Sequence, residues 1–217
     1  MVTAIEIDTD DSSLSDRAFT KVRDMIVNRQ LKGGDNLVES RLAKGLDLTR
    51  TPLREALVRL EGTGLLVKKK GRSFAVRQVN ITEFFQSLKV RQYLETKAAA
   101  LAVGKVTPAE IDYFRQRIKD LSKEDEHVPG HWLLDNDLHE WLARAGGNDV
   151  LAQNILRLRT TTQLFEIGRP FDRADADADE HLEILKAITD GNARAAESAV
   201  LRHLRNIEKD VLGIVAT

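Results

Sequence analysis

Apolar side chains recur every three or four residues along most of this chain, a spacing that places them on one side of a helix. Near the start, residues 14–30 and 39–46 show this spacing. A third helix is expected to begin near Arg50 and to stop at Gly62 and Gly64, because glycine interrupts a helix and favours its end. The inward stripe of this helix consists of Leu53, Ala56, Leu57 and Leu60.

The start of this third helix combines a capping residue with a basic surface. Thr49 has a hydroxyl suited to accept hydrogen bonds from the amides of the first turn, where Pro52 is also tolerated. With the apolar stripe turned inward, Arg50, Thr51 and Arg54 point away from the core. Arginine there can donate two parallel hydrogen bonds to guanine, and a helix N-terminus attracts phosphate. The pattern favours a helix that reads DNA.

A short basic hairpin is predicted directly after this helix. Residues 65–67 and 74–76 suit short strands, and the charged turn between them, 68–72, includes Lys70 and Gly71. A basic helix face or a lysine run alone more often marks an ordinary solvated surface. Three helices followed by a two-stranded basic wing together predict a winged helix-turn-helix.

The rest of the chain is predicted to be almost wholly helical, with a short linker at residues 77–80. Apolar positions keep the helical spacing, Thr107 and Pro108 form a good helix start, and glycines mark several helix ends. The fold class is therefore mainly α: an N-terminal winged helix-turn-helix followed by an antiparallel all-α bundle. The expected bundle helices are 82–103, 108–123, 131–145, 149–166, 174–189 and 193–212.

Charge is divided unevenly along the chain, although its net value is only −1. Lysine and arginine outnumber aspartate and glutamate by 15 to 7 in residues 12–77, whereas acidic residues lead by 23 to 18 in residues 78–217. Residues 1–11 carry 4 acidic and no basic residues and are expected to be a disordered tail. A basic N-terminal domain on an acidic C-terminal domain is expected if only the first meets phosphate.

Several classes of protein are disfavoured by what the chain lacks. It has no cysteine, which excludes disulfides and thiolate chemistry. It has no long apolar run and no recognisable signal peptide, so we expect a soluble cytoplasmic protein that does not associate with membranes.

Four residues of the bundle suggest a metal site. Asp135 and His139 are four positions apart and share one helix face, and His181 and His203 lie in the apolar stripes of two further helices. One carboxylate and three imidazoles suit Zn²⁺, Ni²⁺ or another divalent ion, with positions left for water or an organic acid. By spacing alone, buried histidines satisfied by hydrogen bonds remain the commoner explanation.

The segment LKGGDNLVESRLAKGLDLTRTPLREALVRLEGTGLL resembles the N-terminal domain of the GntR family of bacterial transcription regulators. Two positions depart from that pattern: Ser40 replaces an arginine found in some members, and Asp47 replaces a common glycine in the turn before the recognition helix. The first affects operator preference and the second turn geometry. The resemblance implies DNA contacts from Thr49, Arg50, Thr51, Arg54, Lys70 and Gly71.

The segments VRQYLETKAAALA, DNDLHEWLARAGGNDVL and EHLEILKAITDGNARAAESAVLRHL resemble the helical FCD effector-binding domain of the FadR branch of that family. The resemblance implies that Arg91 faces the effector pocket and pairs with an effector carboxylate. A surface ion pair with Glu95, one turn later, is the alternative. His127 and His131 do not match the pattern and receive no role. The implied metal ligands are Asp135, His139, His181 and His203.

Together these features predict a ligand-controlled DNA switch and no enzymatic activity. The resemblance implies a homodimer on an inverted-repeat operator, acting as a repressor that releases DNA when a small carboxylic acid binds. An aromatic acid is also conceivable because Trp132, Trp141 and Phe165 lie on the bundle, where a core role is the simpler interpretation. Two alternatives use the same Asp/His site: a metal-dependent hydrolase, and a regulator that senses the metal itself.

Overall fold

The computed structural model describes residues 13–124, 128–168 and 173–215, apart from the side chain of Arg72. The acidic segment 1–11 and His127 lie outside these described residues. The chain folds into two compact units, Met1–Val76 and Arg77–Thr217. None of the described helices is long and apolar enough to cross a membrane.

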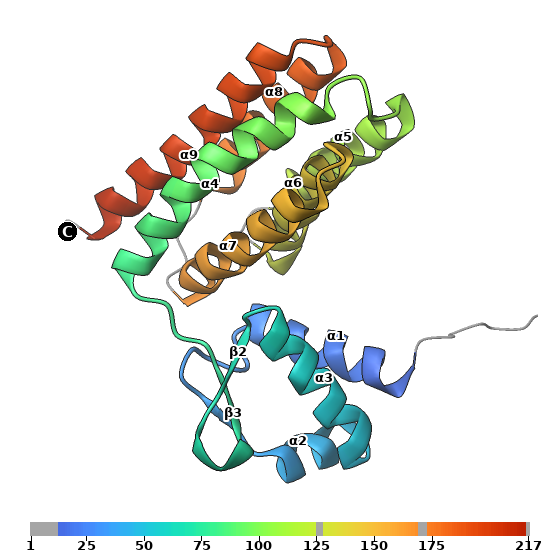
Figure 1. The fold of residues 1–217 in the computed structure, drawn as a ribbon, viewed down its shortest axis with the longest axis vertical. Coiled ribbons are helices and arrows are strands. Elements are labelled where there is room, and N and C mark those ends of the chain that lie inside the picture. Colours follow the sequence, from blue (N-terminus) through green and yellow to red (C-terminus); the bar gives the residue numbers. More distant parts are fainter. Residues whose placement is uncertain (1–12, 125–127, 169–172, 216–217) are drawn as a thin grey trace, which may run out of the picture. The chain divides into compact units, whose positions relative to one another are not determined.

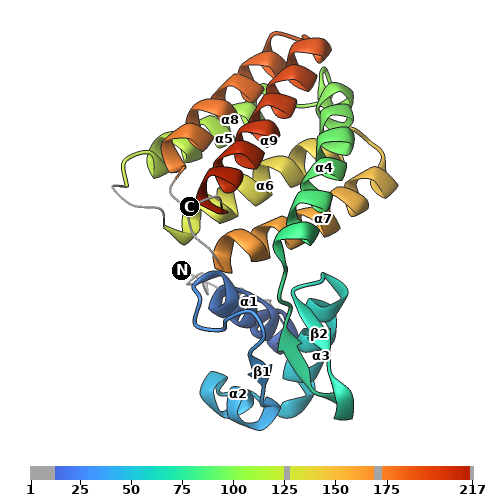
Figure 2. The ribbon, with the colours of Figure 1, turned by 90° about the vertical axis from the view of Figure 1, so that its left-hand side faces the viewer.

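Three helices and a small antiparallel sheet make up the N-terminal unit (Figure 2). The sheet has the order β1-β3-β2, with Asn36 opposite Ala75 and Leu66 opposite Val76. The sequence predicted a two-stranded wing; β1 adds a third strand that is too short to show an alternating pattern. The elements are α1 (Leu14–Val27), β1 (Asn36–Leu37), α2 (Glu39–Leu46), α3 (Arg50–Gly62), β2 (Leu66–Lys68), a 3₁₀ turn (Lys70–Arg72) and β3 (Phe74–Val76).

The core of this unit forms where α1 and α3 pack together. The predicted inward stripe of α3 is fully buried, with Leu53, Leu57 and Leu60 each 0% exposed. Val22 of α1 and Phe74 of β3 are buried with them. Because these apolar residues face inward, the polar side of α3 is left on the surface.

In the described part of the C-terminal unit there are six helices, and the fold class is confirmed as a winged helix-turn-helix followed by a helical bundle. Helix α4 packs against α9, α7 and α6, and runs opposite to α9 in Figure 1. All six predicted helices occur, with ends within three residues of the prediction. They are α4 (Ile81–Ala102), α5 (Pro108–Leu121), α6 (Pro129–Ala145), α7 (Asp149–Gly168), α8 (Ala174–Thr189) and α9 (Ala193–Val215).

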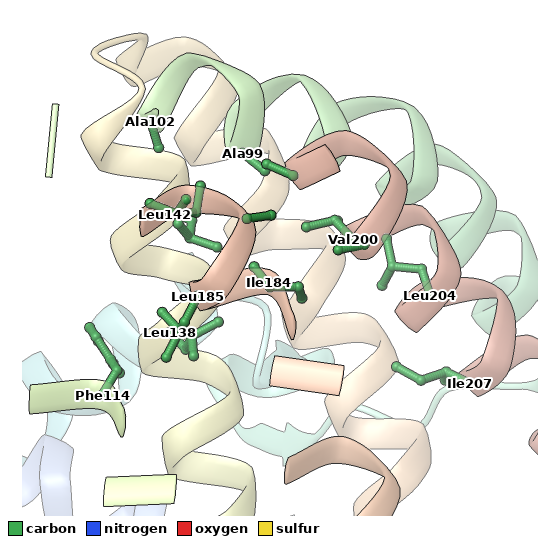
Figure 3. Packing of buried hydrophobic residues seen from close by; sticks show 14 of the residues in the cluster. Ala99, Ala102, Phe114, Leu138, Leu142, Ile184, Leu185, Val200, Leu204 and Ile207 are labelled. Atoms are coloured by element: carbon green, nitrogen blue, oxygen red, sulfur yellow. The ribbon is translucent and has the colours of Figure 1, made fainter. Parts of the chain in front are cut away.

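The interior of the bundle contains an apolar core and, apart from it, a group of buried polar side chains. Phe114, Leu138, Ile184 and Leu204 belong to the apolar core, to which α4, α5, α6, α7, α8 and α9 all contribute side chains; Figure 3 shows part of it. Polar side chains are buried as well, and such groups are stable inside a protein only when they find partners. The buried polar and charged residues of this unit are Ser87, Arg91, Gln92, Glu95, Thr96, His139, Arg159, Thr161, Thr162, Arg173, His181 and His203.

Candidate metal centre and nucleic-acid interface

Three helices bring four candidate ligands together inside the bundle. Asp135 and His139 come from α6, His181 from α8 and His203 from α9, and one ligand atom from each lies within 4.8 Å of the others. The Nε2 atoms of the three histidines lie 3.5, 3.3 and 4.0 Å from Asp135 Oδ1, in chain order. Four atoms bound at about 2.1 Å to one ion would be roughly 3–4 Å apart, so the spacing suits a single metal.

The histidine rings are oriented with Nε2 toward the shared centre. All three Nε2 atoms are buried and have no hydrogen-bond partner in the described part of the chain. On the opposite side of the ring, Nδ1 of His139 lies 2.6 Å from Glu95 Oε2, and Nδ1 of His203 lies 2.7 Å from Glu180 Oε2. A carboxylate on the second nitrogen typically orients a metal-binding histidine. Three buried nitrogen atoms without partners are costly unless an ion binds them, so the residues fit a metal.

The protonation states of these side chains are those that bind metals. Burial lowers the pKa of His139 to about 4 and that of His203 to about 3, so both rings are neutral near pH 7. For Asp135, burial acts to raise the pKa, but Arg159 and the neighbouring histidines outweigh it and hold the pKa well below its usual range. The Asp135 carboxylate and the neutral imidazoles of His139 and His203 are therefore ready to accept a divalent cation.

A small polar cavity of about 30 Å³ adjoins Asp135. Arg91 of α4, Arg159 and Glu166 of α7, and Arg173 at the start of α8 contribute to its wall. Its volume holds about two water molecules. The cavity thus joins the candidate metal centre to a ring of charged side chains from several helices.

Arg91 is held rigidly beside this cavity. Its Nε donates to Glu95 Oε1 at 2.6 Å and its Nη1 donates to Thr162 Oγ1 at 2.7 Å, whereas Nη2 is buried without a partner among the described residues. The ion pair with Glu95 therefore exists, but both side chains are only 3% exposed, so it is not a surface pair. Because Glu95 also contacts His139, Arg91 is linked to a candidate metal ligand.

Two further arginines are fixed by carboxylates of the same region. Arg159 donates to the carboxylate and the backbone oxygen of Asp135. Arg173 contacts three acidic side chains, including Glu180, the partner of His203. The sequence analysis missed both arginines and Glu180, because taken singly none of the three differs from a surface charge.

One signal was nevertheless present in the sequence. Residues 159, 162, 163 and 166 are polar at the spacing that usually carries a buried apolar stripe, and all four line the cavity in the structure. A polar stripe on an otherwise apolar helix indicates a lined cavity.

The remaining histidine and the aromatic residues have different surroundings. His131, which received no role, lies in the first turn of α6 and lines the cavity, where its Nδ1 lies 3.1 Å from the backbone nitrogen of Val128. Trp132 also lines the cavity and is 8% exposed. Phe165 belongs to the apolar core, and Trp141 packs against it from its edge. Only Trp132 is therefore placed to touch a ligand.

The outer face of α3 has the character expected of a DNA-reading helix. Thr49, Arg50, Thr51 and Arg54 are all exposed, and Arg50 and Arg54 have no ion-pair or hydrogen-bond partner among the described residues. Thr49 occupies the N-cap position of α3, but its side chain makes no capping hydrogen bond, contrary to expectation. Its hydroxyl and the first amides of α3 therefore remain available to another partner.

Two turns next to this helix depend on left-handed backbone. Gly71, at the tip between β2 and β3, has φ 78° and ψ 23°, a conformation that favours glycine, and Lys70 beside it is exposed. Asp47, which replaces the common glycine before α3, adopts φ 54°. Aspartate tolerates this region better than most residues, so the replacement preserves the turn.

Comparison with known proteins agrees with this division into two parts. Residues 14–76 match the family of bacterial regulatory proteins named gntR, and residues 86–206 match the FCD domain. The second match alone covers more than half of the chain.

Similar proteins match this chain over most of their length. The Nta operon transcriptional regulator of Aminobacter aminovorans is 27% identical over 194 residues, which is 88% of this chain and 91% of that protein. The regulator LutR of Bacillus subtilis is 29% identical over 211 residues, covering 87% and 96%. The solved structure of E. coli McbR/YncC shares the fold, with a TM-score of 0.77 at 20% identity over 95% of this chain and 100% of that one. The chain therefore belongs to the GntR family of bacterial regulatory proteins, carries an FCD domain, and is a transcriptional regulator rather than an enzyme.

Proposed function

We propose that this regulator is a repressor of the FadR branch, whose affinity for its operator is controlled by a small carboxylic acid bound beside a metal ion in the FCD domain. The observation that carries the proposal is that three buried histidine Nε2 atoms, without hydrogen-bond partners in the described part of the chain, meet Asp135 next to a cavity lined by Arg91, whose Nη2 is likewise buried without such a partner. Buried polar atoms without partners destabilise a protein. A metal ion would bind the histidine nitrogens, and an anionic ligand would bind Arg91 Nη2.

The metal would be held by Asp135, His139, His181 and His203. Imidazole and carboxylate ligands suit Zn²⁺ or Ni²⁺, and four protein ligands leave a coordination position for an oxygen atom of the effector in a five- or six-coordinate site. When bound, the ion supplies positive charge that attracts such an oxygen.

The effector carboxylate would bind Arg91. Its guanidinium is already held by Glu95 and Thr162, so the one open edge, Nη2, is fixed in place before a ligand arrives. Because the cavity measures only about 30 Å³, binding of an organic acid is expected to widen it. A ligand that favours one arrangement of the helices over another can shift a regulator between states.

On the DNA side, Arg50 and Arg54 of α3 would read base edges and the wing tip would contact the backbone. A homodimer with two such units would recognise an inverted repeat, since twofold protein symmetry requires a twofold site. This role places the protein with the chromosome in the bacterial cytoplasm. The proposed contacts come from Thr49, Arg50, Thr51, Arg54, Lys70 and Gly71.

The proposal is tested by a gel-shift titration of the promoter next to the protein's own gene, with metal-loaded protein and a panel of small carboxylic acids. A specific shift that one acid reverses supports it. The variant Arg54→Ala should bind operator about 5–150-fold more weakly, the equivalent of roughly 1–3 kcal/mol, and still bind the acid. Arg205→Ala, on the exposed side of α9, is the charge-matched control and should bind normally.

Other outcomes contradict parts of the proposal. Normal operator binding by Arg54→Ala would reject the role of α3. Release of DNA by metal alone, with no effect of any acid, would favour a metal sensor. The hydrolase alternative is not retained, because the family and the relatives are transcriptional regulators.

A further inference from the structure

Helix α7 presents a polar stripe to the cavity, formed by Arg159, Thr162, Gln163 and Glu166. The first two are bonded: Arg159 donates to Asp135, and Thr162 accepts from Arg91. Within the described parts of the chain, Gln163 and Glu166 form no hydrogen bond or ion pair with the protein. Arg159 and Thr162 thus orient Asp135 and Arg91, whereas Gln163 and Glu166 remain available to a ligand.

We propose that Glu166 determines effector specificity by forming a hydrogen bond with a hydroxyl group of a hydroxy acid whose carboxylate binds Arg91. The inference rests on the proposed function, because it assumes that the effector occupies this cavity. It adds the chemical class of the effector and the residue that selects it.

Arg91 and Glu166 need different partners. Thr162, which holds Arg91, and Glu166 are four residues apart, so they lie on the same side of α7. Arg91 donates hydrogen bonds, which a ligand carboxylate accepts, whereas the oxygens of Glu166 accept hydrogen bonds and need a donor. A ligand that satisfies Arg91 and Glu166 together therefore carries a donor group besides its carboxylate.

The charges on the cavity wall favour a hydroxyl as that second group. Glu166 shares the wall with Asp135 and Asp177, so a second carboxylate of the ligand would meet three acidic side chains. A hydroxyl carries no charge and donates a hydrogen bond to a carboxyl oxygen. The other charged or titratable groups on the cavity wall are Arg91, His131, Arg159 and Arg173.

The expected selectivity follows from the cost of leaving Glu166 without a partner. An acid that lacks the hydroxyl would enclose Glu166 in the cavity unpaired, whereas water satisfies it in the free protein. Sites built to bond a hydroxyl reject analogues without it strongly. We expect a preference of at least about tenfold for the hydroxy acid.

The test compares acids that differ only in one hydroxyl: malate with succinate, lactate with propionate, and mandelate with phenylacetate. Binding to the metal-loaded full-length protein is measured by calorimetry. In at least one pair the wild type should favour the hydroxy acid by tenfold or more. Glu166→Ala should reduce that ratio to below about threefold, mainly because the acid without the hydroxyl binds more tightly once it no longer buries an unpaired carboxyl group. Glu166→Gln, which keeps a donor and an acceptor, should retain the ratio.

Controls separate the possible failures. Asp179→Ala removes an exposed carboxylate of α8 and should leave every ratio unchanged. If Glu166→Ala does not fold or loses metal, Glu166→Leu, closer in volume, replaces it, and Glu166→Gln must still keep the wild-type ratio. A ratio that survives loss of the carboxyl group would assign hydroxyl recognition to the metal and overturn this inference alone. Failure of all six acids to bind the wild type would overturn the proposed effector site as well.

Discussion

At the scale of single residues, the two ring nitrogens of His139 and of His203 have different surroundings. In His139 and His203, Nδ1 faces a glutamate while Nε2 is buried without a partner. Glu95 is itself bonded to Arg91, and Glu180 to Arg173, so each of these two histidines is backed by a carboxylate and an arginine. Such chains fix both the orientation and the tautomer of the ring.

This arrangement predicts that the two rings stay neutral in metal-free protein. Because burial lowers the pKa of His139 to about 4 and that of His203 to about 3, neither ring should gain a proton between pH 8 and pH 5. Nitrogen-15 NMR should show the proton on Nδ1 and an unprotonated Nε2 throughout. In urea, the same two histidines should titrate near 6.5, as exposed imidazoles do. A midpoint near 6.5 for either ring in the folded protein would contradict the prediction.

At the scale of elements, the threonines at the N-cap positions of α5 and α3 differ in whether they stabilise their helix. Thr107 forms a complete capping box at the start of α5: its hydroxyl accepts the backbone N–H of Glu110, and the Glu110 side chain accepts from the backbone N–H of Thr107. Thr49, at the same position of α3, makes no such bond. One threonine thus stabilises a helix, and the other remains available on the proposed DNA-binding face.

The capping box makes a prediction about stability. Thr107→Ala should lower the free energy of unfolding of the helical unit by about 1 kcal/mol, since the variant loses a cap hydrogen bond. Urea unfolding followed by tryptophan fluorescence reports on this unit, because Trp132 and Trp141, the only two tryptophans, both lie in it. Thr82→Ala, at an exposed position of α4, is the control and should change stability by less than about 0.5 kcal/mol. Equal effects of the two variants would show that the cap contributes nothing.

At the scale of the whole molecule, the basic and acidic residues fall into separate units. The N-terminal unit holds the basic excess and the exposed arginines of α3, while the helical unit holds the acidic excess and the buried polar site. DNA attracts basic surfaces through its phosphates, so nonspecific contact should be confined to the first unit. The second unit is left to bind ligands and, in the proposed homodimer, to join two copies.

The homodimer predicts a fixed spacing between operator half-sites. Inserting five base pairs at the centre of the operator turns one half-site by about half a helical turn, which two linked DNA-binding units cannot follow. Affinity measured by fluorescence anisotropy should fall at least tenfold. Replacing the five central base pairs without changing the length should have a much smaller effect. Unchanged binding to the lengthened operator would mean that the units bind DNA independently.

A structural feature of this protein could be predicted from the sequence when it depends on residues close together in the chain. Helix positions follow from local periodicity, so the order of helices and the inward stripe of α3 were predictable. The two-residue strand β1 was not, because a strand that short has no pattern of its own and exists only through pairing with β3.

The candidate site divides in the same way. His139 could be paired with Asp135 from their spacing on one helix. Its grouping with His181 and His203 was a weak candidate from their positions in apolar stripes, and the family resemblance strengthened it. Only the tertiary structure decided that the Arg91–Glu95 pair is buried and that Glu166 faces the cavity. The physical reason is that burial and partner choice depend on which helix faces pack together, and these contacts join residues far apart in the chain. The sequence alone does not show whether a charged residue is exposed to solvent or buried beside a metal site.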